Sequence, residues 1–365
     1  MTTLATRPNV VGALRERVLK FAERVTTPLV PNDYLDVIDP LRSGADLRGR
    51  IVAIHPETRD AATVVIRPGR GWRPHLPGQY VRIGVDVDGV RQWRAYSLTS
   101  KTQRRDGCIA VTVKAIPDGL VSNHLVRRAT VGTVLQLDQA AGEFTLGNQV
   151  PAKILFLTAG SGVTPVMGML RNMASLGAAA DIVVVHSAPS ADDVIFGWEL
   201  RMLAREGRIR LVERHTDTDG MLDVARLADL VPDFAGRETW ACGPAGLLDA
   251  IEQRWDAEGI TDRLHIERFR PVVITAGEGG TVTFAKSGSV VEADGSQTLL
   301  DTGESAGVLM PSGCRMGVCF GCVVPLRQGA VRDLRNGGVT TANPGDNVQI
   351  QTCVSAAAGA CELDL

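Results

Sequence analysis

Four cysteines near the C-terminus constrain this chain more than any other feature of its sequence. Cys314, Cys319 and Cys322 follow the spacing C-x4-C-x2-C, and Cys353 lies further along the chain. This is the spacing of a plant-type [2Fe–2S] site, in which four thiolates bind two irons. The two glycines of the loop allow backbone N–H groups to approach the cluster sulfurs. The sequence therefore predicts an iron–sulfur domain and the transfer of single electrons.

Length and composition indicate a soluble protein of two or three domains. The chain has 365 residues, with 44% hydrophobic and 22% charged residues, which is ordinary for globular proteins. A net charge of −2 does not favour a nucleic-acid partner. We find no apolar run long enough for a transmembrane helix, and the N-terminus lacks the apolar core of a signal peptide.

The cysteines also indicate the compartment. The chain has seven cysteines, an odd number, and four of them fit a metal pattern that needs reduced thiols. We therefore expect a cytoplasmic protein. Residues 1–49 form an N-terminal helical extension in this interpretation, with one apolar stripe (Val11, Leu14, Val18, Phe21 and Val25) opposite basic residues. Such a helix either packs on the neighbouring domain or lies on the inner face of the membrane.

The rest of the chain divides into three domains and a linker. Residues 50–149 contain short alternating strands, which predict an antiparallel β-barrel interrupted by a helical piece over 121–128. Residues 150–270 alternate apolar strands with helices, which predicts an α/β domain with a parallel sheet. Residues 271–280 are rich in glycine and small side chains, as in a linker. Residues 281–365 are expected to form an α+β, ferredoxin-like (β-grasp) domain around the cluster.

Two motifs in the barrel carry candidate chemistry. Arg94, Tyr96 and Ser97 end a strand, where a guanidinium suits a diphosphate, a ring suits stacking on a flat cofactor, and a hydroxyl suits a ring nitrogen. Alternation places Arg94 and Tyr96 on one face and Ser97 on the other. Further on, Gly119 and Ser122 open a short helix, whose N-terminus could bind phosphate. An ordinary surface strand and simple capping by Ser122 are the alternatives.

The α/β domain has two candidate motifs after its strands. Gly160 and Gly162 fit a tight turn that a diphosphate can approach, with Thr164 as helix N-cap and Pro165 as first helical residue. The third glycine of G-x-G-x-x-G is missing, so the standard dinucleotide fingerprint is not met. The segment Cys242-Gly243-Pro244 follows a later strand, at the edge where ligands bind in such sheets.

The choice between NADPH and NADH depends on groups that bind a 2′-phosphate. Ser187 follows the second strand of the α/β domain, and Arg214 with His215 follows the third. A hydroxyl and a cation favour NADPH, whereas Asp192 and Asp193, close to Ser187, are less favourable to a phosphate. The pattern favours NADPH and leaves NADH open.

In this order the motifs resemble those of the ferredoxin–NADP reductase superfamily, and the appended cluster domain resembles three-part flavin, nicotinamide and ferredoxin reductases. Overall, the chain is most similar to the actinobacterial reductases that pass electrons from NADPH to a membrane acyl-CoA Δ9-desaturase. The likeness includes the segments 41–44 and 94–100. One departure is Phe320, where relatives commonly have glycine; its ring would shield the cluster or form a docking surface.

The resemblance implies roles for matching residues. Tyr96 and Ser97 would act at the flavin ring, with Ser97 bonded to N5 and Arg94 bound to the FAD phosphate. Glu267 and Phe269 would close the flavin face. The rest of the FAD site would comprise Val113, Lys114, Gly119, Val121 and Ser122. The nicotinamide dinucleotide would be held by Gly160, Gly162, Thr164, Pro165, Ser187, Arg214, Cys242, Gly243 and Pro244.

These expectations combine into one electron path. Because nicotinamide gives a hydride and a [2Fe–2S] cluster takes one electron, a flavin is needed between them. The path would run from NADPH through FAD and the cluster to a redox partner protein, a membrane acyl-CoA desaturase that serves fatty-acid desaturation. One alternative is the reductase component of a soluble ring-hydroxylating or acyl-CoA oxygenase. Another is a binding protein that senses redox state through its cluster.

Overall fold

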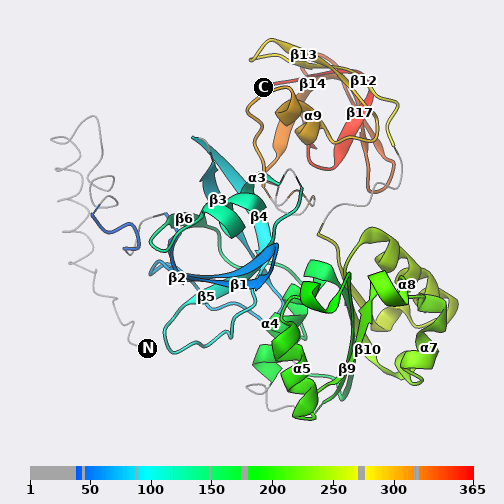
Figure 1. Ribbon diagram of the computed structural model, residues 1–365. Helices are drawn as coiled ribbons and strands as arrows, with labels where there is room; N and C mark the ends of the chain where they lie inside the picture. Colours follow the sequence, from blue (N-terminus) through cyan, green and yellow to red (C-terminus); the bar gives the residue numbers. More distant parts are fainter. Residues whose placement is uncertain are drawn as a thin grey trace, which may run out of the picture.

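The computed structural model describes residues 38–365 except 43–45, 88, 118, 148, 174–179, 270–275, 314, 316, 318 and 319. Figure 1 shows three units in chain order, each built on its own sheet. The apolar stripe expected in the N-terminal extension lies outside the described residues, as does most of the expected linker. In the described part of the chain, no helix is long and apolar enough to cross a membrane.

The first unit is an antiparallel barrel of six strands in the order β4-β3-β6-β1-β2-β5. Alternating residues of these strands point inward, and Ile51, Ile66 and Ile83 are fully buried in its core. The helix α3 (Leu120–Asn123) continues as a π-helical turn over His124–Arg128. The strands are β1 (Arg48–Thr58), β2 (Ala61–Pro68), β3 (Tyr80–Val87), β4 (Val90–Ser97), β5 (Ile109–Lys114) and β6 (Val134–Leu137).

The second unit is a parallel sheet of five strands in the order β11-β10-β7-β8-β9, with helices on both faces (Figure 1). The order reverses beside β7, and the crevice at such a point is where open α/β sheets bind ligands. The strands are β7 (Lys153–Ala159), β8 (Asp181–Ala188), β9 (Arg210–His215), β10 (Glu238–Cys242) and β11 (Leu264–Glu267). The helices are α4 (Val163–Met173), α5 (Gly197–Arg205), α6 (Thr216–Asp219), α7 (Leu227–Leu230) and α8 (Ala245–Ala257).

Two helix starts differ from the sequence prediction. The helix α4 begins at Val163, so Thr164 is not its N-cap and Pro165 is not its first residue. The reason is that the 3₁₀ turn Gly160–Gly162 runs directly into α4, and Thr164 Oγ1 instead donates to the Ser161 carbonyl at 2.9 Å. Proline is still tolerated there, since the first N–H groups of a helix have no intrahelical partner.

A second difference concerns the segment between β8 and β9, where strand–helix alternation predicts one helix. Residues Ala191–Asp193 form a single 3₁₀ turn, and α5 begins only at Gly197. Phe196 has φ 60°, a left-handed conformation that interrupts a right-handed helix. Before β10 the chain likewise forms a 3₁₀ turn over Val224–Arg226 and the short α7.

The third unit is a six-stranded mixed sheet covered by the helix α9 (Leu299–Ser305). Its order is β13-β12-β17-β14-β15, and β16 pairs with β14. Antiparallel, parallel and mixed sheets in this succession confirm the predicted fold class. The strands are β12 (Gly280–Phe284), β13 (Ser289–Ala293), β14 (Val323–Asp333), β15 (Val339–Ala342), β16 (Val348–Gln351) and β17 (Ser355–Leu363).

The barrel and the parallel-sheet unit pack tightly along α4. Asn172 is buried and accepts hydrogen bonds from the backbone and hydroxyl of Thr102, while its amide donates to the Ser100 carbonyl. A Cβ at Gly168 would lie 2.3 Å from the Leu98 carbonyl oxygen, so only glycine allows this approach. These contacts fix the carboxyl edge of the parallel sheet beside the barrel.

Candidate functional site

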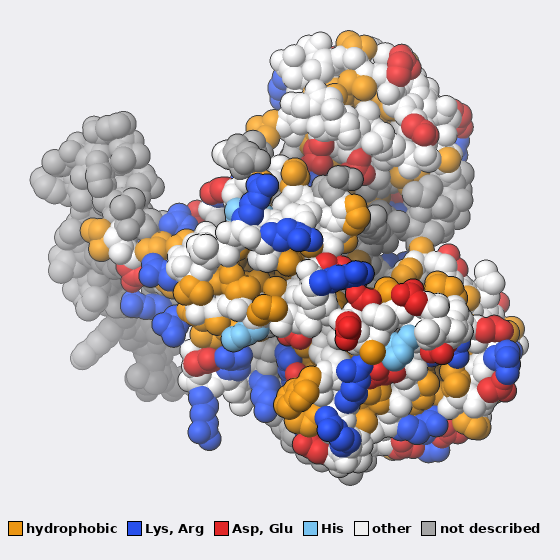
Figure 2. Space-filling view, viewed as in Figure 1, with side chains coloured by type: hydrophobic (Ala, Val, Ile, Leu, Met, Phe, Trp, Pro, Cys, Tyr) orange, Lys and Arg blue, Asp and Glu red, His pale blue; other side chains and the backbone are white. Residues whose placement is uncertain are grey.

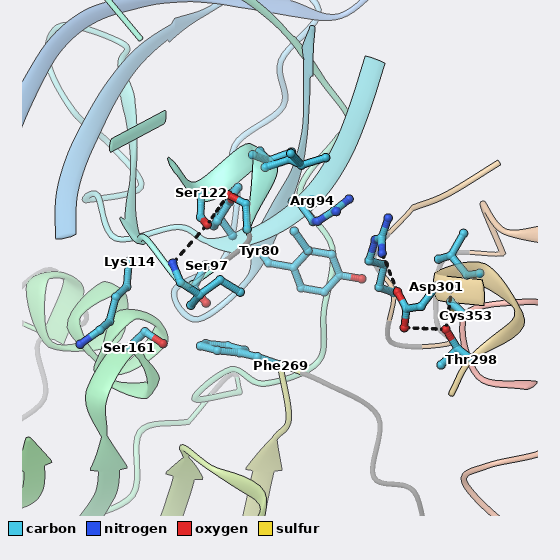
Figure 3. Close-up of a pocket in the computed structure, with 18 of the residues that line it drawn as sticks. Tyr80, Arg94, Ser97, Lys114, Ser122, Ser161, Phe269, Thr298, Asp301 and Cys353 are labelled. Carbon is cyan, nitrogen blue, oxygen red and sulfur yellow. Dashed lines mark hydrogen bonds and ion pairs between the residues drawn. The ribbon is translucent and has the colours of Figure 1, made fainter. Parts of the chain in front are cut away.

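A cavity of about 860 Å³ lies where the three units meet. Figure 3 shows its labelled side chains converging from the barrel above, the parallel-sheet unit below and the C-terminal unit on the right. On the surface in Figure 2, acidic and basic side chains lie side by side near this junction. Most of the residues predicted for a flavin site line this cavity: Arg94, Tyr96, Ser97, Lys114, Gly119, Val121, Ser122, Glu267 and Phe269.

The end of β4 supplies the barrel wall. Burial, and then the charge of Arg315, lower the pKa of Arg94 to about 10, so Arg94 remains a cation at neutral pH. Burial raises the pKa of Tyr96, which keeps its phenol neutral. Ser97 is 4% exposed, and its hydroxyl has no hydrogen-bond partner among the described residues. Ser97 lines the same cavity as Arg94 and Tyr96 although alternation predicted the opposite face, because β4 ends there.

The second barrel wall comes from β5 and the start of α3. A Cβ at Gly119 would lie 2.4 Å from Ser122 Oγ and 2.6 Å from the side chain of Ile116, so this turn requires glycine. Ser122 Oγ donates to the Gly119 carbonyl and accepts from the Ile116 N–H. It therefore ties the turn together and does not cap α3, which has no side-chain cap.

One residue predicted for the flavin site does not line the cavity. Val113 is fully buried in the barrel core and does not line the cavity. Its neighbours Thr112 and Lys114 line the cavity instead, as the two-residue period of a strand requires. Lys114 also lies 3.4 Å from Asp60 in an ion pair.

The parallel-sheet wall brings two predicted motifs together. A Cβ at Gly162 would lie 2.0 Å from the Cys242 carbonyl oxygen and 2.9 Å from the Gly243 nitrogen. The turn after β7 is therefore packed directly against the end of β10. Gly160 has φ 52°, and a Cβ there would meet nothing within 4 Å. The backbone of Gly160 is therefore accessible at the carboxyl edge of the sheet, where a diphosphate can approach.

Cys242 and Glu267 are cross-strand partners at the same edge, on β10 and β11. Burial raises the pKa of Glu267 to about 8, and its Oε2 has no partner within the described part of the chain. The pKa of Cys242 is raised by burial and then by Glu267. At neutral pH both groups are mainly uncharged. Phe269, just beyond β11, adds an aromatic ring to the cavity.

Replacing Glu267 by glutamine should make the protein more stable at alkaline pH. The unfolded carboxyl ionises near pKa 4.5 and the folded one near 8. Between these values the folded state keeps a proton that the unfolded state releases, so wild-type stability falls as pH rises through this window. We expect no advantage of Glu267→Gln below pH 4.5 and about 2–4 kcal/mol at pH 8. Thermal melting of the flavin-loaded protein at both pH values checks this, and a pH-independent difference would contradict it.

Ser187 and Arg214 face each other across paired strands β8 and β9. Ser187 Oγ and Arg214 Nε are both buried, and neither has a hydrogen-bond partner among the residues described. Arg214 Nη2 donates to the Asp219 carbonyl at 2.5 Å, which holds the guanidinium beside the strand end. Asp193, which the sequence placed as unfavourable to a phosphate, forms an ion pair with Arg59 and accepts from the Ser190 hydroxyl.

The described part of the cluster site consists of Cys322 and Cys353. Their sulfurs lie 3.1 Å apart, well beyond the roughly 2.05 Å of a disulfide bond. Both are buried, and Cys353 also lines the cavity. Cys314 and Cys319 lie outside the described residues. Two buried sulfurs brought together from the cluster loop and the turn before β17 fit a thiolate ligand set.

Phe320 and Gly317 are described residues of the cluster loop. Phe320 is 67% exposed at φ 56°, so its ring faces solvent. Gly317 has φ 75°, and its carbonyl accepts hydrogen bonds from Arg335 Nη1 and Gln351 Nε2. These bonds anchor Gly317 to the turn after β14 and to the end of β16.

Sequence reasoning missed the wall that the C-terminal unit contributes. Its motifs were local, and no spacing in the chain signals which residues of one domain face another. Of the residues in this wall, only Arg315 could have been singled out from the sequence, because it lies within the cysteine motif. The missed lining residues of this unit are Ser296, Gln297, Thr298, Leu300, Asp301, Glu304 and Arg315. Tyr80, Thr112 and Ser161, on the other two walls, were missed as well.

Comparison with known proteins identifies each unit. Family models of an oxidoreductase FAD-binding domain, an oxidoreductase NAD-binding domain and a 2Fe-2S iron-sulfur cluster binding domain match residues 74–146, 156–253 and 282–358. An NADPH oxidoreductase of Mycobacterium tuberculosis (strain ATCC 25618 / H37Rv) is 49% identical over 368 residues, covering 98% of this chain and 96% of that protein. The chain belongs to the ferredoxin–NADP reductase superfamily.

The chain is also similar to two further proteins. The ferredoxin reductase component of 3-ketosteroid-9-alpha-monooxygenase from Mycolicibacterium smegmatis (strain ATCC 700084 / mc(2)155) is 31% identical, covering 80% of this chain and 89% of that protein. The structure of phthalate dioxygenase reductase superposes with a TM-score of 0.61 at 21% identity, covering 87% of this chain and 97% of that one. The latter likeness shows the shared fold.

The reductase is therefore an oxidoreductase that uses FAD, a nicotinamide dinucleotide and a [2Fe–2S] cluster. The cavity fits the flavin, since it offers a half-buried cation, a neutral aromatic phenol and a buried hydroxyl without a partner in the described structure. The open turn at Gly160 fits a dinucleotide, and the paired sulfurs of Cys322 and Cys353 fit the cluster.

Proposed function

We propose that this reductase passes electrons from NADPH through FAD and its [2Fe–2S] cluster to a membrane acyl-CoA Δ9-desaturase, in fatty-acid desaturation leading to oleate. The observation that carries the electron path is that Cys353 lines the same cavity as Arg94, Tyr96 and Ser97. The proposed cluster ligand and the proposed flavin-binding residues thus line one cavity, and electron transfer requires this proximity. In this assignment FAD binds within 50–149, the dinucleotide within 150–270 and the cluster within 281–365.

The residues of the barrel hold and orient the flavin in this proposal. When bound, FAD accepts a hydride from the nicotinamide and gives up electrons singly. Arg94 binds the phosphate, Tyr96 stacks along the cofactor, and the unpartnered hydroxyl of Ser97 donates to a ring nitrogen. Lys114, Gly119, Val121 and Ser122 complete this site.

The residues of the parallel-sheet unit hold the nicotinamide dinucleotide. The open backbone of Gly160 and Gly162 receives the diphosphate, next to Thr164 and Pro165 at the start of α4. Cys242, Gly243 and Pro244 place the nicotinamide at the cavity. Glu267 and Phe269 cover it, and the raised pKa of Glu267 keeps a proton available beside the reacting rings.

NADPH is proposed as the donor because of the pair Ser187 and Arg214. Each has a buried polar atom without a partner in the part of the chain described, and they lie on neighbouring strands. A phosphate bound between them would satisfy both atoms. Asp193 does not oppose this, since its carboxylate is already paired with Arg59.

Arg214→Ala should change the cofactor preference. We expect kcat/KM for NADPH to fall by about 10- to 100-fold, while that for NADH changes little, because only NADPH has the phosphate. Arg210→Ala is the matched control, since this exposed residue begins the same strand at its other end. Ferricyanide reduction with each donor gives the ratio. An unchanged ratio in Arg214→Ala would remove this residue from the proposed clamp.

The desaturase partner is proposed from the overall likeness of the chain and from the basic, apolar-striped N-terminal segment. The test combines purified reductase, NADPH, stearoyl-CoA and membranes that contain a Δ9-desaturase. Oleoyl-CoA that forms only with the reductase present is the expected result. Cytochrome c reduction in the same preparation controls for an active reductase. Active reduction without oleoyl-CoA would keep the electron path and exclude this partner.

The second candidate is a soluble ring-hydroxylating or acyl-CoA oxygenase. It is favoured by the 31% identity to the reductase component of a monooxygenase. Deletion of residues 1–37 separates the two candidates. Loss of desaturation with cytochrome c reduction intact is expected if the partner is in the membrane, whereas unchanged coupling would favour the soluble oxygenase.

A further inference from the structure

The C-terminal unit holds one arginine rigidly at the edge of the cavity. Arg315 Nη1 donates to Asp301 Oδ1 at 3.0 Å, and Nη2 donates to Glu304. Both carboxylates belong to α9, and Asp301 is itself fixed at the helix start by the Thr298 side chain. Arg315, Asp301, Glu304 and Thr298 all line the cavity.

The backbone of Arg315 indicates that this placement is specific. Its φ is 60°, a conformation that costs free energy for a residue with a Cβ. Its side chain is only 20% exposed. Beyond the two ion pairs at least one donor is available, because Nε is buried without a partner among the residues described. A long cation is thus held beside the cavity with an unused hydrogen-bond donor.

Arg94 approaches the same region from the barrel. Figure 3 shows Arg94 directed toward the side of the cavity where Asp301 and Cys353 lie. The charge of Arg315 is the second cause, after burial, that lowers the pKa of Arg94, so the two guanidinium groups are close enough to repel. An anion between them would remove this repulsion and gain from both.

The charges of the cavity wall do not oppose such an anion. Its cationic lining residues are Arg94, Lys114 and Arg315. Its acidic ones are Asp301, Glu304 and Glu267, and the raised pKa of Glu267 keeps that carboxyl mainly protonated at neutral pH. Because Lys114 is paired with Asp60, the two arginines and the two charged carboxylates balance, and the phosphates of FAD do not meet a net negative wall.

We propose that Arg315, although it belongs to the iron–sulfur unit, completes the phosphate-binding wall of the flavin cavity together with Arg94. This rests on the proposed placement of FAD in the cavity. FAD binding and docking of the iron–sulfur unit on the barrel then reinforce each other, because the cofactor contacts both and thermodynamic coupling is reciprocal. The iron–sulfur unit is then held more tightly on the barrel when the flavin is bound.

The test is the dissociation constant of FAD for the full-length apoprotein, read from the quenching of flavin fluorescence. Arg315→Gln should raise this constant about tenfold, and Arg315→Lys should change it less than about threefold, because lysine keeps the charge. Arg327→Gln is the control, since this arginine of the same unit pairs with Glu362 and Asp364 and does not line the cavity. Visible absorption of the cluster confirms that each variant has a folded iron–sulfur unit.

Glu304→Gln separates an electrostatic role from a structural one. Removing this carboxylate makes the cavity more positive, so FAD should bind as tightly as in the wild type or more tightly. If Arg315 only stabilised its own loop, Arg315→Gln and Glu304→Gln would each break the ion pair, and both would weaken FAD binding to the same extent. Equal weakening in both variants, or an FAD affinity in Arg315→Gln equal to that of Arg327→Gln, would overturn the proposal. Failure of the wild type to bind FAD would instead contradict the flavin placement itself.

Discussion

Cys353→Ala is expected to abolish the reduction of cytochrome c while leaving NADPH-dependent ferricyanide reduction by the flavin. Cys353 is buried, its sulfur lies 3.1 Å from that of Cys322, and it lines the cavity. Loss of this thiolate removes one of four cluster ligands and with it the single-electron exit. We expect cytochrome c reduction to fall by about two orders of magnitude. Steady-state rates with both acceptors, and iron content, measure the effect.

The matched control for this substitution is Cys361→Ala. Cys361 is a buried cysteine of the same unit, outside the motif, and burial raises the pKa of its thiol to about 11. Its replacement should preserve the cluster and both activities. Equal loss of cytochrome c reduction in the two variants would point to damage of the fold. Loss of both activities in flavin-loaded Cys353→Ala would contradict an electron path in which the flavin precedes the cluster.

Gly162→Ala should impair NADPH use without emptying the flavin site. The added Cβ would lie 2.0 Å from the Cys242 carbonyl oxygen, and backbone at that distance has to move. Either the turn after β7 or the end of β10 is displaced, and both carry the proposed dinucleotide site. We expect at least a tenfold rise in KM for NADPH and a loss of about 1–3 kcal/mol of stability. FAD content should remain near that of the wild type.

Gly246→Ala provides the comparison for this prediction. Gly246 lies in α8 of the same unit, and a Cβ there would meet nothing within 4 Å. Alanine is also the better helix former, so this variant should be as stable as the wild type or slightly more stable. A KM for NADPH in Gly162→Ala that matches that of Gly246→Ala would show that the close approach does not shape the dinucleotide site.

Most of the fold that could be predicted followed from local sequence patterns. Alternation of apolar and polar residues predicted the barrel strands, and alternation of strands with helices predicted the parallel sheet. The four-residue strand β6 was too short to show a period. The strands β14–β17 were not predicted, and β17 in particular reads as alanine and glycine without alternation. The late start of α5 depends on the left-handed backbone of Phe196, which its sequence does not signal.

The same distinction applies to the candidate site, where residues of local motifs could be predicted and residues placed by domain packing could not. Residues within local motifs, such as Ser97 and Gly162, are placed by one strand and its turn, so the sequence could indicate them. Val113 was included from the resemblance alone, whereas strand alternation turns its side chain into the barrel core. The contribution of Asp301, Glu304 and Arg315 depends on how the third unit packs on the first. That packing depends on how the surfaces of the two units fit together, and no residue spacing within the chain indicates it.

The most direct test of the electron path is an anaerobic titration of the purified reductase with NADPH. Flavin absorbance and the EPR signal of the reduced cluster are followed in the same sample. We expect the flavin to bleach and the cluster signal to appear, with about three electrons taken up per chain, two by the flavin and one by the cluster. A fully reduced flavin beside a cluster that stays oxidised would contradict this electron path.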